Sequence, residues 1–158
     1  MTDARKDAAQ MEGAVPGRLL PNHNYELNGH KHTTDAKGRI KTVEGELRLD
    51  PAKRNKSAQS GVGADDGRLS TNEGGHLIGS QFGGYRNVEN LTPMDKKINN
   101  YHKGEWGKME KRWAEDLKNG KSVKVKIEIN YPDDTARAGS FQVTEVVDGS
   151  KKVRVIEN

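Results

Sequence analysis

The sequence contains no cysteine, few aromatic residues and no long hydrophobic run. The absence of cysteine excludes disulfide bonds, thiol nucleophiles and cysteine-ligated zinc. Apolar runs are only a few residues long, whereas a membrane-spanning helix needs about 20 apolar residues. Residues 1–10 lack the apolar stretch of a secretory signal. The sequence therefore predicts no membrane segment, and any export would depend on a signal elsewhere.

Apolar residues are scarce overall, at 31% of the chain against 32% charged residues. A chain of 158 residues with this composition is expected to bury one small core rather than two. Residues 1–18 show no periodicity and predict a linker or flexible tail, with a short docking helix as the alternative. The folded domain is predicted at residues 19–158.

The chain is mildly basic, with a net charge of +4 and a pI of about 9.2. A basic surface favours a polyanionic partner such as nucleic acid, although charge alone is a weak signal. The alternating lysines of residues 121–126 are expected to form a solvated sheet face rather than a phosphate-binding one.

Residues 24–49 predict a short antiparallel meander. Asn28-Gly29 is a strong hairpin-turn signal, and residues 35–38 indicate a second turn. His30 and His32 share one face of the strand between these turns. Two histidines without a third ligand are more typical of a polar hairpin face than of a metal site. Apolar residues alternate with polar ones on both sides of the turns, at Tyr25, Leu27, Ile40, Val43, Leu47 and Leu49.

Three further segments follow along the chain. Residues 53–72 contain few apolar side chains and predict a long irregular surface loop. Residues 104–118 predict a helix, because Trp106, Met109, Trp113 and Leu117 share one stripe at helical spacing. The remainder predicts an antiparallel sheet packed on that helix, since apolar residues alternate from Val123 to Tyr131 and continue through Phe141, Val143, Val153 and Val155.

His76 is the leading candidate for chemistry. It is flanked by Gly74-Gly75 and by Leu77-Ile78, which predicts a position on or beside a short strand with open space around the ring. A histidine near its ordinary pKa can take a proton from water at physiological pH. A lone histidine is more often structural, so the interpretation depends on the residues that surround it.

Oxygen-bearing side chains follow His76 at suggestive positions. Asn99 or Asn100 can bind a metal through the side-chain carbonyl, because Mg²⁺ often takes only one or two protein ligands. Glu110, one turn after Trp106, can accept a hydrogen bond from a metal-bound water. The structural alternatives are a pair of turn-forming asparagines and an exposed helical glutamate. His102 is expected to be a loop residue, with substrate contact as the alternative.

These residues carry a resemblance to a known family. The sequence includes Gly-Gly-His-Leu-Ile at 74–78, Phe-Gly-Gly at 82–84, Asn-Leu-Thr-Pro-Met at 90–94, a following Asn and Trp-x-x-x-Glu at 106–110. In this order and spacing they resemble the DNA/RNA non-specific endonuclease family. The segments Asn-His-x-Tyr, Thr-Asp-x-x-Gly-Arg and Lys-Arg-Asn…Gln resemble its bacterial polymorphic-toxin branch. The resemblance covers residues 20–158.

The resemblance implies an α+β fold with a ββα-metal (His-Me finger) core, antiparallel sheets and one main helix packed on them. It implies that His76 is the general base and that Asn99, nine positions after Asn90, binds the metal, with Asn100 as the alternative ligand. It also places Asn90 and Glu110 among the catalytic positions, and it implies Mg²⁺ as cofactor, with Mn²⁺ able to substitute.

The chain departs from the family pattern at one motif. Many members have Asp-Arg-Gly-His where this chain has Glu73-Gly74-Gly75-His76, so another cation must meet the charge of the transition state. Arg54 is the first candidate and Arg86 the second. Substrate contacts are expected from Arg86, Lys53 and Gly75. The interval from Asn99 to Trp106 is also longer than in well-known members, which keeps Asn99 and Asn100 both open.

The leading hypothesis is a magnesium-dependent endonuclease for DNA, RNA or both. It is predicted to be the C-terminal toxin domain of a larger exported bacterial effector that acts in the target-cell cytoplasm. An acidic immunity protein is expected to neutralise it. One alternative is a secreted scavenging nuclease with no immunity partner. Another is a nucleic-acid-binding module without catalysis, which the lack of aromatic interleaving disfavours.

Overall fold

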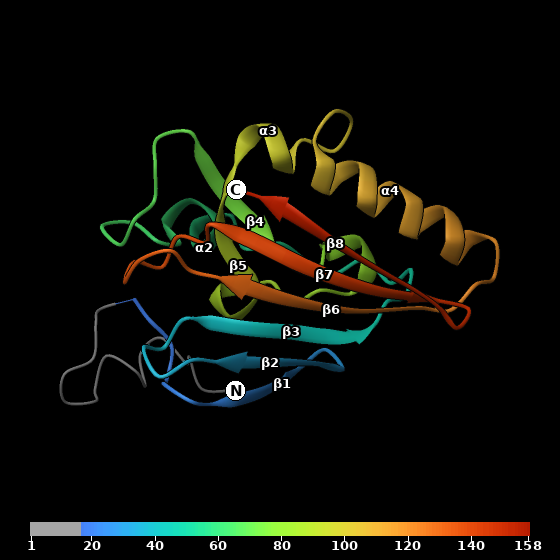
Figure 1. The fold of residues 1–158 in the computed structure, drawn as a ribbon, viewed down its shortest axis with the longest axis horizontal. Helices are drawn as coiled ribbons and strands as arrows, with labels where there is room; N and C mark the ends of the chain where they lie inside the picture. The colour runs from blue at the N-terminus through green and yellow to red at the C-terminus, as the bar shows by residue number, and fades with distance from the viewer. Residues whose placement is uncertain (1–16) are drawn as a thin grey trace.

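The computed structural model describes residues 17–158 and contains a six-stranded antiparallel sheet, a two-stranded sheet and a main helix (Figure 1). The predicted tail therefore lies outside the described residues except for Gly17 and Arg18. The guanidinium of Arg18 donates two 2.9 Å hydrogen bonds to the carboxylate of Asp66, so the folded region includes this residue. The large sheet has the order β1-β2-β3-β6-β7-β8. Its strands are β1 (Asn24–Leu27), β2 (His30–Thr34), β3 (Ile40–Glu46), β6 (Val123–Asn130), β7 (Ser140–Val147) and β8 (Ser150–Glu157).

The predicted meander is confirmed as strands β1, β2 and β3. Asn28 and Gly29 both have positive φ, at 55° and 83°, as the tight turn between β1 and β2 requires. The expectation of a polar face at His30 and His32 was wrong. Both rings are buried, and each has one ring nitrogen bonded to a backbone carbonyl, that of Glu46 for His30 and that of Glu89 for His32. Burial lowers the pKa of His32 to about 4, so this part of the core contains a neutral imidazole.

Strands β6 and β7 follow the predicted alternation. In β6 the buried residues Val123, Val125 and Ile127 alternate with exposed Lys124 and Lys126, which confirms the solvated lysine face. Strand β8 does not follow the prediction, because Val153 and Val155 are half-exposed and the buried apolar residue is Ile156. The register explains this, because Val153 and Val155 lie opposite Thr144 and Gln142 on the outer face of the sheet, whereas Ile156 lies opposite the buried Phe141.

Strands β3 and β6 are neighbours in the sheet although the chain between them is long. The backbone N–H of Leu47 donates to the carbonyl of Val123 at 2.8 Å, which closes this excursion at its base. The excursion contains the small sheet of β4 (Asn72–His76) and β5 (Leu91–Asp95), together with the helices of residues 17–158. These helices are α2 (Lys56–Gly61), α3 (Lys96–Asn99), α4 (Glu105–Lys118) and the 3₁₀ turns η1 (Ser80–Phe82) and η2 (Val88–Asn90).

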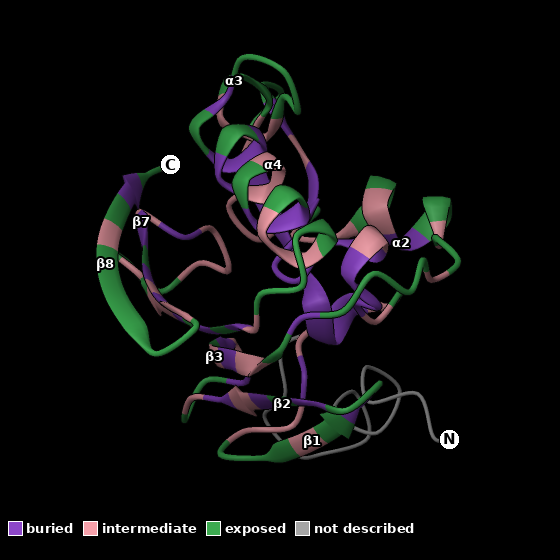
Figure 2. Cartoon of the chain, turned by 90° about the vertical axis from the view of Figure 1, so that its right-hand side faces the viewer, coloured by how far each residue is buried: buried purple, intermediate pink, exposed green. Residues whose placement is uncertain are grey.

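Helix α4 confirms the predicted helix and packs on the large sheet (Figure 2). Trp106, Met109 and Trp113 form its buried stripe. The Trp106 ring meets Phe141 of β7 edge-on, with the ring centroids 5.2 Å apart. Burial of such aromatic surface is the main stabilising contribution of a helix of this kind.

Helix α2 corrects the prediction of an irregular loop at residues 53–72. The side chain of Asn55 caps the helix by accepting a 3.1 Å hydrogen bond from the N–H of Ala58. Ala58 is also the buried residue of α2. The helix packs closely on β4, because a Cβ atom on Gly74 would lie 2.2 Å from the carbonyl oxygen of Gln59. Glycine at position 74 therefore allows α2 to approach the strand that carries His76. Within residues 17–158, none of the helices has the length and apolar character needed to cross a membrane.

Candidate active site

The two-stranded sheet and the helices after it form the framework of the site. Strand β4 ends at His76, whose register partner in β5 is Leu91. The chain then turns from β5 into α3, which ends at Asn99, and continues into α4, which carries Glu110. The side chain of Asp95 caps α3 by accepting a 2.8 Å hydrogen bond from the N–H of Lys97. This ββα order brings residues that are distant in sequence onto one side of the molecule.

A pocket of about 480 Å³ opens where these elements meet. This volume suits a nucleotide-sized group. Helix α2 and the segment before it form one wall, β4 and η1 form the floor, and α3 and α4 form the opposite wall. The pocket is lined by Arg54, Gln59, Glu73, His76, Gly79, Ser80, Gln81, Asn99, Asn100, Tyr101 and Glu110.

His76 is buried, with an exposed fraction of 8%, and its ring belongs to the pocket lining. Its Nε2 atom is enclosed and has no hydrogen-bond partner, so Nδ1 is the ring nitrogen that solvent in the pocket can contact. Burial, reinforced by the positive charge of Arg54, lowers the pKa of His76 to about 4. An ordinary pKa was predicted from the sequence, whereas the buried ring is held more firmly in its neutral form.

Asn99 and Glu73 form a direct pair across the pocket. The Nδ2 atom of Asn99 donates to Oε1 of Glu73 at 2.7 Å. The side-chain carbonyl oxygen of Asn99 accepts no hydrogen bond from any described residue and remains available to a ligand. Asn100 differs, because its Oδ1 accepts hydrogen bonds from the backbone N–H groups of His102 and Lys103, both at 3.0 Å. This contrast favours Asn99 as the oxygen donor and gives Asn100 a role in shaping the loop.

The carboxyl group of Glu110 lies against the backbone of Gly79, where a Cβ atom would come within 2.4 Å of Oε2. Burial raises the pKa of Glu110 to about 8, although the charge of Arg54 acts in the opposite direction. In the metal-free protein this carboxyl group is therefore largely protonated at neutral pH. A cation in the pocket would favour its ionised form.

Arg54 is the pocket residue that brings positive charge to both His76 and Glu110. Its Nε atom donates a 3.1 Å hydrogen bond to the hydroxyl of Ser80, which fixes the side chain over η1. The next residue, Asn55, caps α2 and also donates from Nδ2 to Oδ1 of Asn87 at 2.8 Å. These contacts fix the segment that carries Arg54 beside β4.

Residues 21–149 match the family model for the DNA/RNA non-specific endonuclease. The chain belongs to this family. The match covers most of the described residues, and it confirms the family and the class of enzyme that the motifs predicted: a nuclease that hydrolyses nucleic acid.

Among curated relatives of this endonuclease, the Type VII secretion system protein EssD of Staphylococcus aureus strain USA300 is 40% identical over 148 residues. EssD of strain NCTC 8325 matches to the same extent. The match covers 90% of this chain but only 24% of EssD, so the chain spans about a quarter of the length of these relatives.

Two solved structures share the fold of this endonuclease. NucA from Streptococcus agalactiae with magnesium ion bound superposes with a TM-score of 0.62 at 15% identity, covering 89% of this chain and 74% of that chain. Sda1 nuclease with bound zinc ion superposes with a TM-score of 0.61 at 18% identity, covering 86% of this chain and 73% of that chain. The predicted α+β fold with a ββα-metal core is thereby confirmed.

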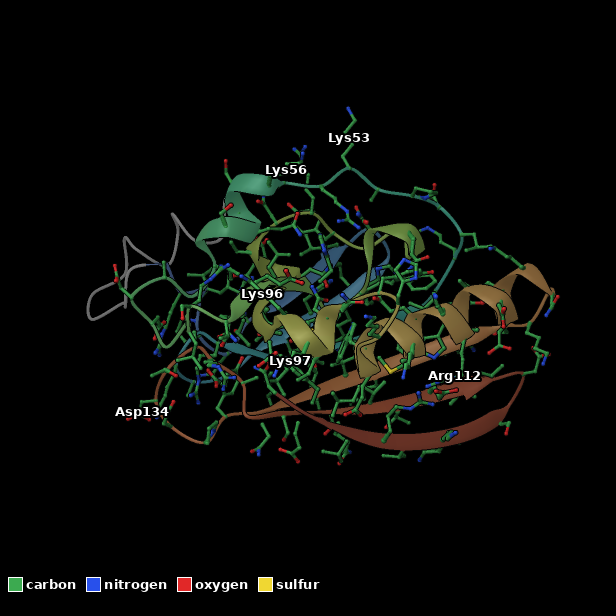
Figure 3. All side chains as sticks on the ribbon, turned by 90° about the horizontal axis from the view of Figure 1, so that it is seen from above. Lys53, Lys56, Lys96, Lys97, Arg112 and Asp134 are labelled. Carbon is green, nitrogen blue, oxygen red and sulfur yellow. The ribbon has the colours of Figure 1, made fainter. Side chains whose placement is uncertain are left out.

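Four residues of the predicted site do not line the pocket of the endonuclease. Asn90 is fully buried, and its side chain bonds the N–H and C=O of Ile78 and the C=O of Tyr85, so it holds the backbone after His76. Gly75 faces the core, where a Cβ atom would lie 3.0 Å from the Cβ of Met94. Arg86 is exposed outside the pocket, and the Lys53 side chain extends away from the body of the molecule (Figure 3). The structure thus gives Asn90 and Gly75 structural roles, and places Arg86 and Lys53 outside the pocket.

The sequence analysis missed Glu73, Gln59 and Tyr101 as pocket residues. Glu73 was available from its place in the motif, where many members have an aspartate, but its partner Asn99 lies 26 residues away. Gln59 enters the pocket because α2 packs on β4, where its Nε2 donates to the carbonyl of Gly74 at 3.2 Å. Tyr101 lies in the lengthened interval after Asn99.

Proposed function

We propose that this chain hydrolyses phosphodiester bonds of DNA, RNA or both in a reaction that depends on a divalent cation, with Mg²⁺ as the preferred ion and Mn²⁺ as a substitute. The single observation that carries the proposal is the pocket itself. It combines a neutral imidazole, an oriented amide oxygen, two carboxyl groups and one guanidinium. Phosphodiester hydrolysis needs a base for water, positive charge at the phosphate and a cation beside the leaving oxygen.

The residues of the pocket fit such a cation. Its oxygen donors are the amide of Asn99 and the carboxyl groups of Glu73 and Glu110. Within residues 17–158 there is no cluster of three or more His, Cys, Asp or Glu side chains that could enclose a metal ion. Mg²⁺ retains several water molecules and takes few protein ligands, all of them oxygens, so this donor set suits it. When bound, the cation would neutralise charge on the phosphate and on the departing oxygen.

The protein's own groups have separate tasks in this mechanism. His76 accepts a proton at Nδ1 from the attacking water, whose oxygen forms the new bond to phosphorus. Arg54 donates to a non-bridging oxygen and offsets the charge that develops there. The bond from phosphorus to the 3′ oxygen breaks, and that oxygen gains a proton from solvent. All these groups address the phosphate, so base identity has little influence on cleavage.

We further propose that the chain is the toxin domain of an exported bacterial effector that acts in the target-cell cytoplasm. The similarity to EssD, a Type VII secretion system protein, supports this role. The absence of cysteine suits a domain that must work in a reducing compartment. A cognate immunity protein with an acidic surface is expected, because it would face a pocket that contains Arg54, on a chain with a net charge of +4.

The test compares plasmid DNA and RNA as substrates, each with Mg²⁺ or with chelator. Wild-type protein should cleave at least one substrate, and only with Mg²⁺. His76→Ala should lose roughly 10²–10⁴-fold in rate, and Asn99→Ala should require more Mg²⁺. His23→Ala is the matched control, because His23 is exposed at the start of β1. Cleavage that persists in chelator, or that is insensitive to His76→Ala, would contradict the proposal.

The toxin role needs a separate experiment. Expression of the wild-type chain in a bacterial cytoplasm should arrest growth and degrade nucleic acid, whereas expression of His76→Ala should not. Equal toxicity of both chains would show that the growth defect does not come from phosphodiester cleavage.

A further inference from the structure

Tyr101 is distinctive among the aromatic residues of the chain. All eight phenylalanine, tryptophan and tyrosine residues lie in the described part, and Tyr101 alone is exposed, at 39%. It also lines the pocket that contains His76 and Glu110. An aromatic ring that is exposed in the free protein gives up the stabilisation that burial would provide. Its exposure at the edge of a nuclease pocket is explained if a ligand covers the ring.

The loop that carries Tyr101 is firmly braced. The side chain of Asn100 accepts hydrogen bonds from two backbone N–H groups of this loop, those of His102 and Lys103. The loop also packs closely against α4. A Cβ atom on Gly107 of this helix would lie 2.2 Å from the carbonyl oxygen of Asn100 and 2.4 Å from the Cα of Tyr101. A ring held on such a backbone loses little conformational entropy when a ligand stacks on it.

Positive charge lies over one face of this ring, which leaves the opposite face for stacking. The Nζ atom of Lys111 is 5.2 Å from the centre of the Tyr101 ring and 3.1 Å from Nδ1 of His102. The His102 ring meets Tyr101 edge-on, with the centroids 5.5 Å apart. The exposed Lys96 and Lys97 lie on α3 (Figure 3), whose last residue, Asn99, lines the pocket. A flat aromatic surface next to an ammonium group matches the base and the phosphate of one nucleotide.

We propose that Tyr101 and Lys111 form a nucleotide subsite beside the scissile phosphate, where the Tyr101 ring stacks on an unpaired base and Lys111 binds the adjoining phosphate. This inference rests on the proposed nuclease function. Stacking accepts every base, so the subsite is compatible with cleavage that ignores sequence. A base inside a duplex already has both faces covered and must be unstacked to reach the ring. The enzyme should therefore prefer single-stranded nucleic acid over intact duplex.

Binding to the His76→Ala protein tests the subsite without cleavage. Fluorescence anisotropy would measure the affinity of two labelled single strands with the same backbone, one of thymidines and one of abasic units. Adding Tyr101→Ala should weaken binding of the thymidine strand roughly tenfold and leave the abasic strand unchanged. Tyr101→Phe should restore the difference, because the face of the ring makes the contact. Leu69→Ala, an exposed apolar residue outside the pocket, is the control for surface truncation.

Lys111→Gln separates the two parts of the subsite. It should weaken both strands equally and reduce the salt dependence of binding, because the ammonium group acts on phosphate. In the active protein, Tyr101→Ala should raise KM for single-stranded substrate more than it lowers kcat. An equal effect of Tyr101→Ala on thymidine and abasic strands, or no effect on either, would overturn the subsite. The binding experiment needs no turnover, so it tests the subsite even if the wild-type protein cleaves no substrate. Absence of cleavage would refute the proposed nuclease function alone.

Discussion

The side-chain amide of Asn99 donates a 2.7 Å hydrogen bond to the carboxylate of Glu73. An asparagine amide can rotate to present either its nitrogen or its oxygen, and this bond selects one orientation. With Nδ2 directed at Glu73, the carbonyl oxygen must point to the other side. The pair therefore orients the oxygen that we propose as the metal ligand, as partners of metal ligands generally do.

Removal of Glu73 should consequently weaken metal binding. We expect Glu73→Ala to raise the Mg²⁺ concentration for half-maximal cleavage by about 10–100-fold. Glu73→Gln should lose less, since its amide oxygen can still accept from Asn99. The readout is a Mg²⁺ titration of plasmid cleavage, with Glu115→Ala, an exposed change on α4, as control. An unaltered Mg²⁺ requirement in Glu73→Ala would show that the pair does not prepare a metal site.

The lowered pKa of His76 predicts the acidic side of the pH profile. Because the ring must be neutral to accept a proton, kcat/KM should fall only as the pH drops through about 4, where His76 becomes protonated. Arg54→Ala removes one cause of the lowered pKa and should move this limb to higher pH as well as slowing the reaction. Cleavage of a short oligonucleotide across the pH range gives the profile. A wild-type limb near the ordinary histidine pKa would contradict the burial argument.

The raised pKa of Glu110 predicts how the free energy of unfolding, measured in chelator, depends on pH. Its pKa is raised from 4.5 to about 8, so between these values the folded state binds a proton more tightly than the unfolded chain. The stability contributed by the neutral carboxyl group is full below pH 4.5 and is lost as the pH rises through about 8. Glu110→Gln should unfold in urea near the wild-type midpoint at acidic pH and become relatively more stable above about pH 8. Both proteins contain the same histidines, so the contribution of histidine titration cancels in the difference between their urea midpoints. A constant difference across the pH range would refute it.

Two glycines test the contact between α2 and β4. Gly74→Ala would place a Cβ atom 2.2 Å from the carbonyl oxygen of Gln59, so α2 must move away from the strand. We expect a loss of about 1–3 kcal/mol in unfolding free energy, and reduced cleavage because Arg54 moves with the helix. Gly61→Ala is the control, since no atom lies within 4 Å of its added Cβ. Calorimetric melting of both variants measures the effect, and equal melting temperatures would argue against the tight contact.

Much of the framework could be predicted from local patterns. The turn at Asn28-Gly29, the stripe of α4 and the alternation in β6 are determined by neighbours in sequence, and all three were confirmed. The pocket positions of His76, Asn99 and Glu110 followed from motif order. Their chemical roles are predictions.

Other features depend on contacts between distant segments. Helix α2 has Ala58 as its one buried residue, so its sequence carries almost no helical apolar stripe. His30 and His32 are polar in sequence, but inside the core one nitrogen of each ring pairs with a backbone carbonyl, that of Glu46 or Glu89. Val153 and Val155 alternate like buried residues, yet their register with Thr144 and Gln142 of β7 puts them on the outer face of the sheet. In each case the deciding partner lies outside any short sequence window.

The order of the large sheet also has a mechanical consequence. Strands β1 and β8 form its two outer borders (Figure 1), and each is bonded to one neighbour only. Tension applied to the chain ahead of β1 is resisted first by the Arg18–Asp66 ion pair and by the backbone bond from Leu19 to Gly38, and then by four residue pairs with β2. At the other end, the side chain of Asn158 donates to the carbonyl oxygens of Pro93 and Ala138. Pulling from either end therefore loads these terminal contacts first and then one border strand, before any inner strand is reached.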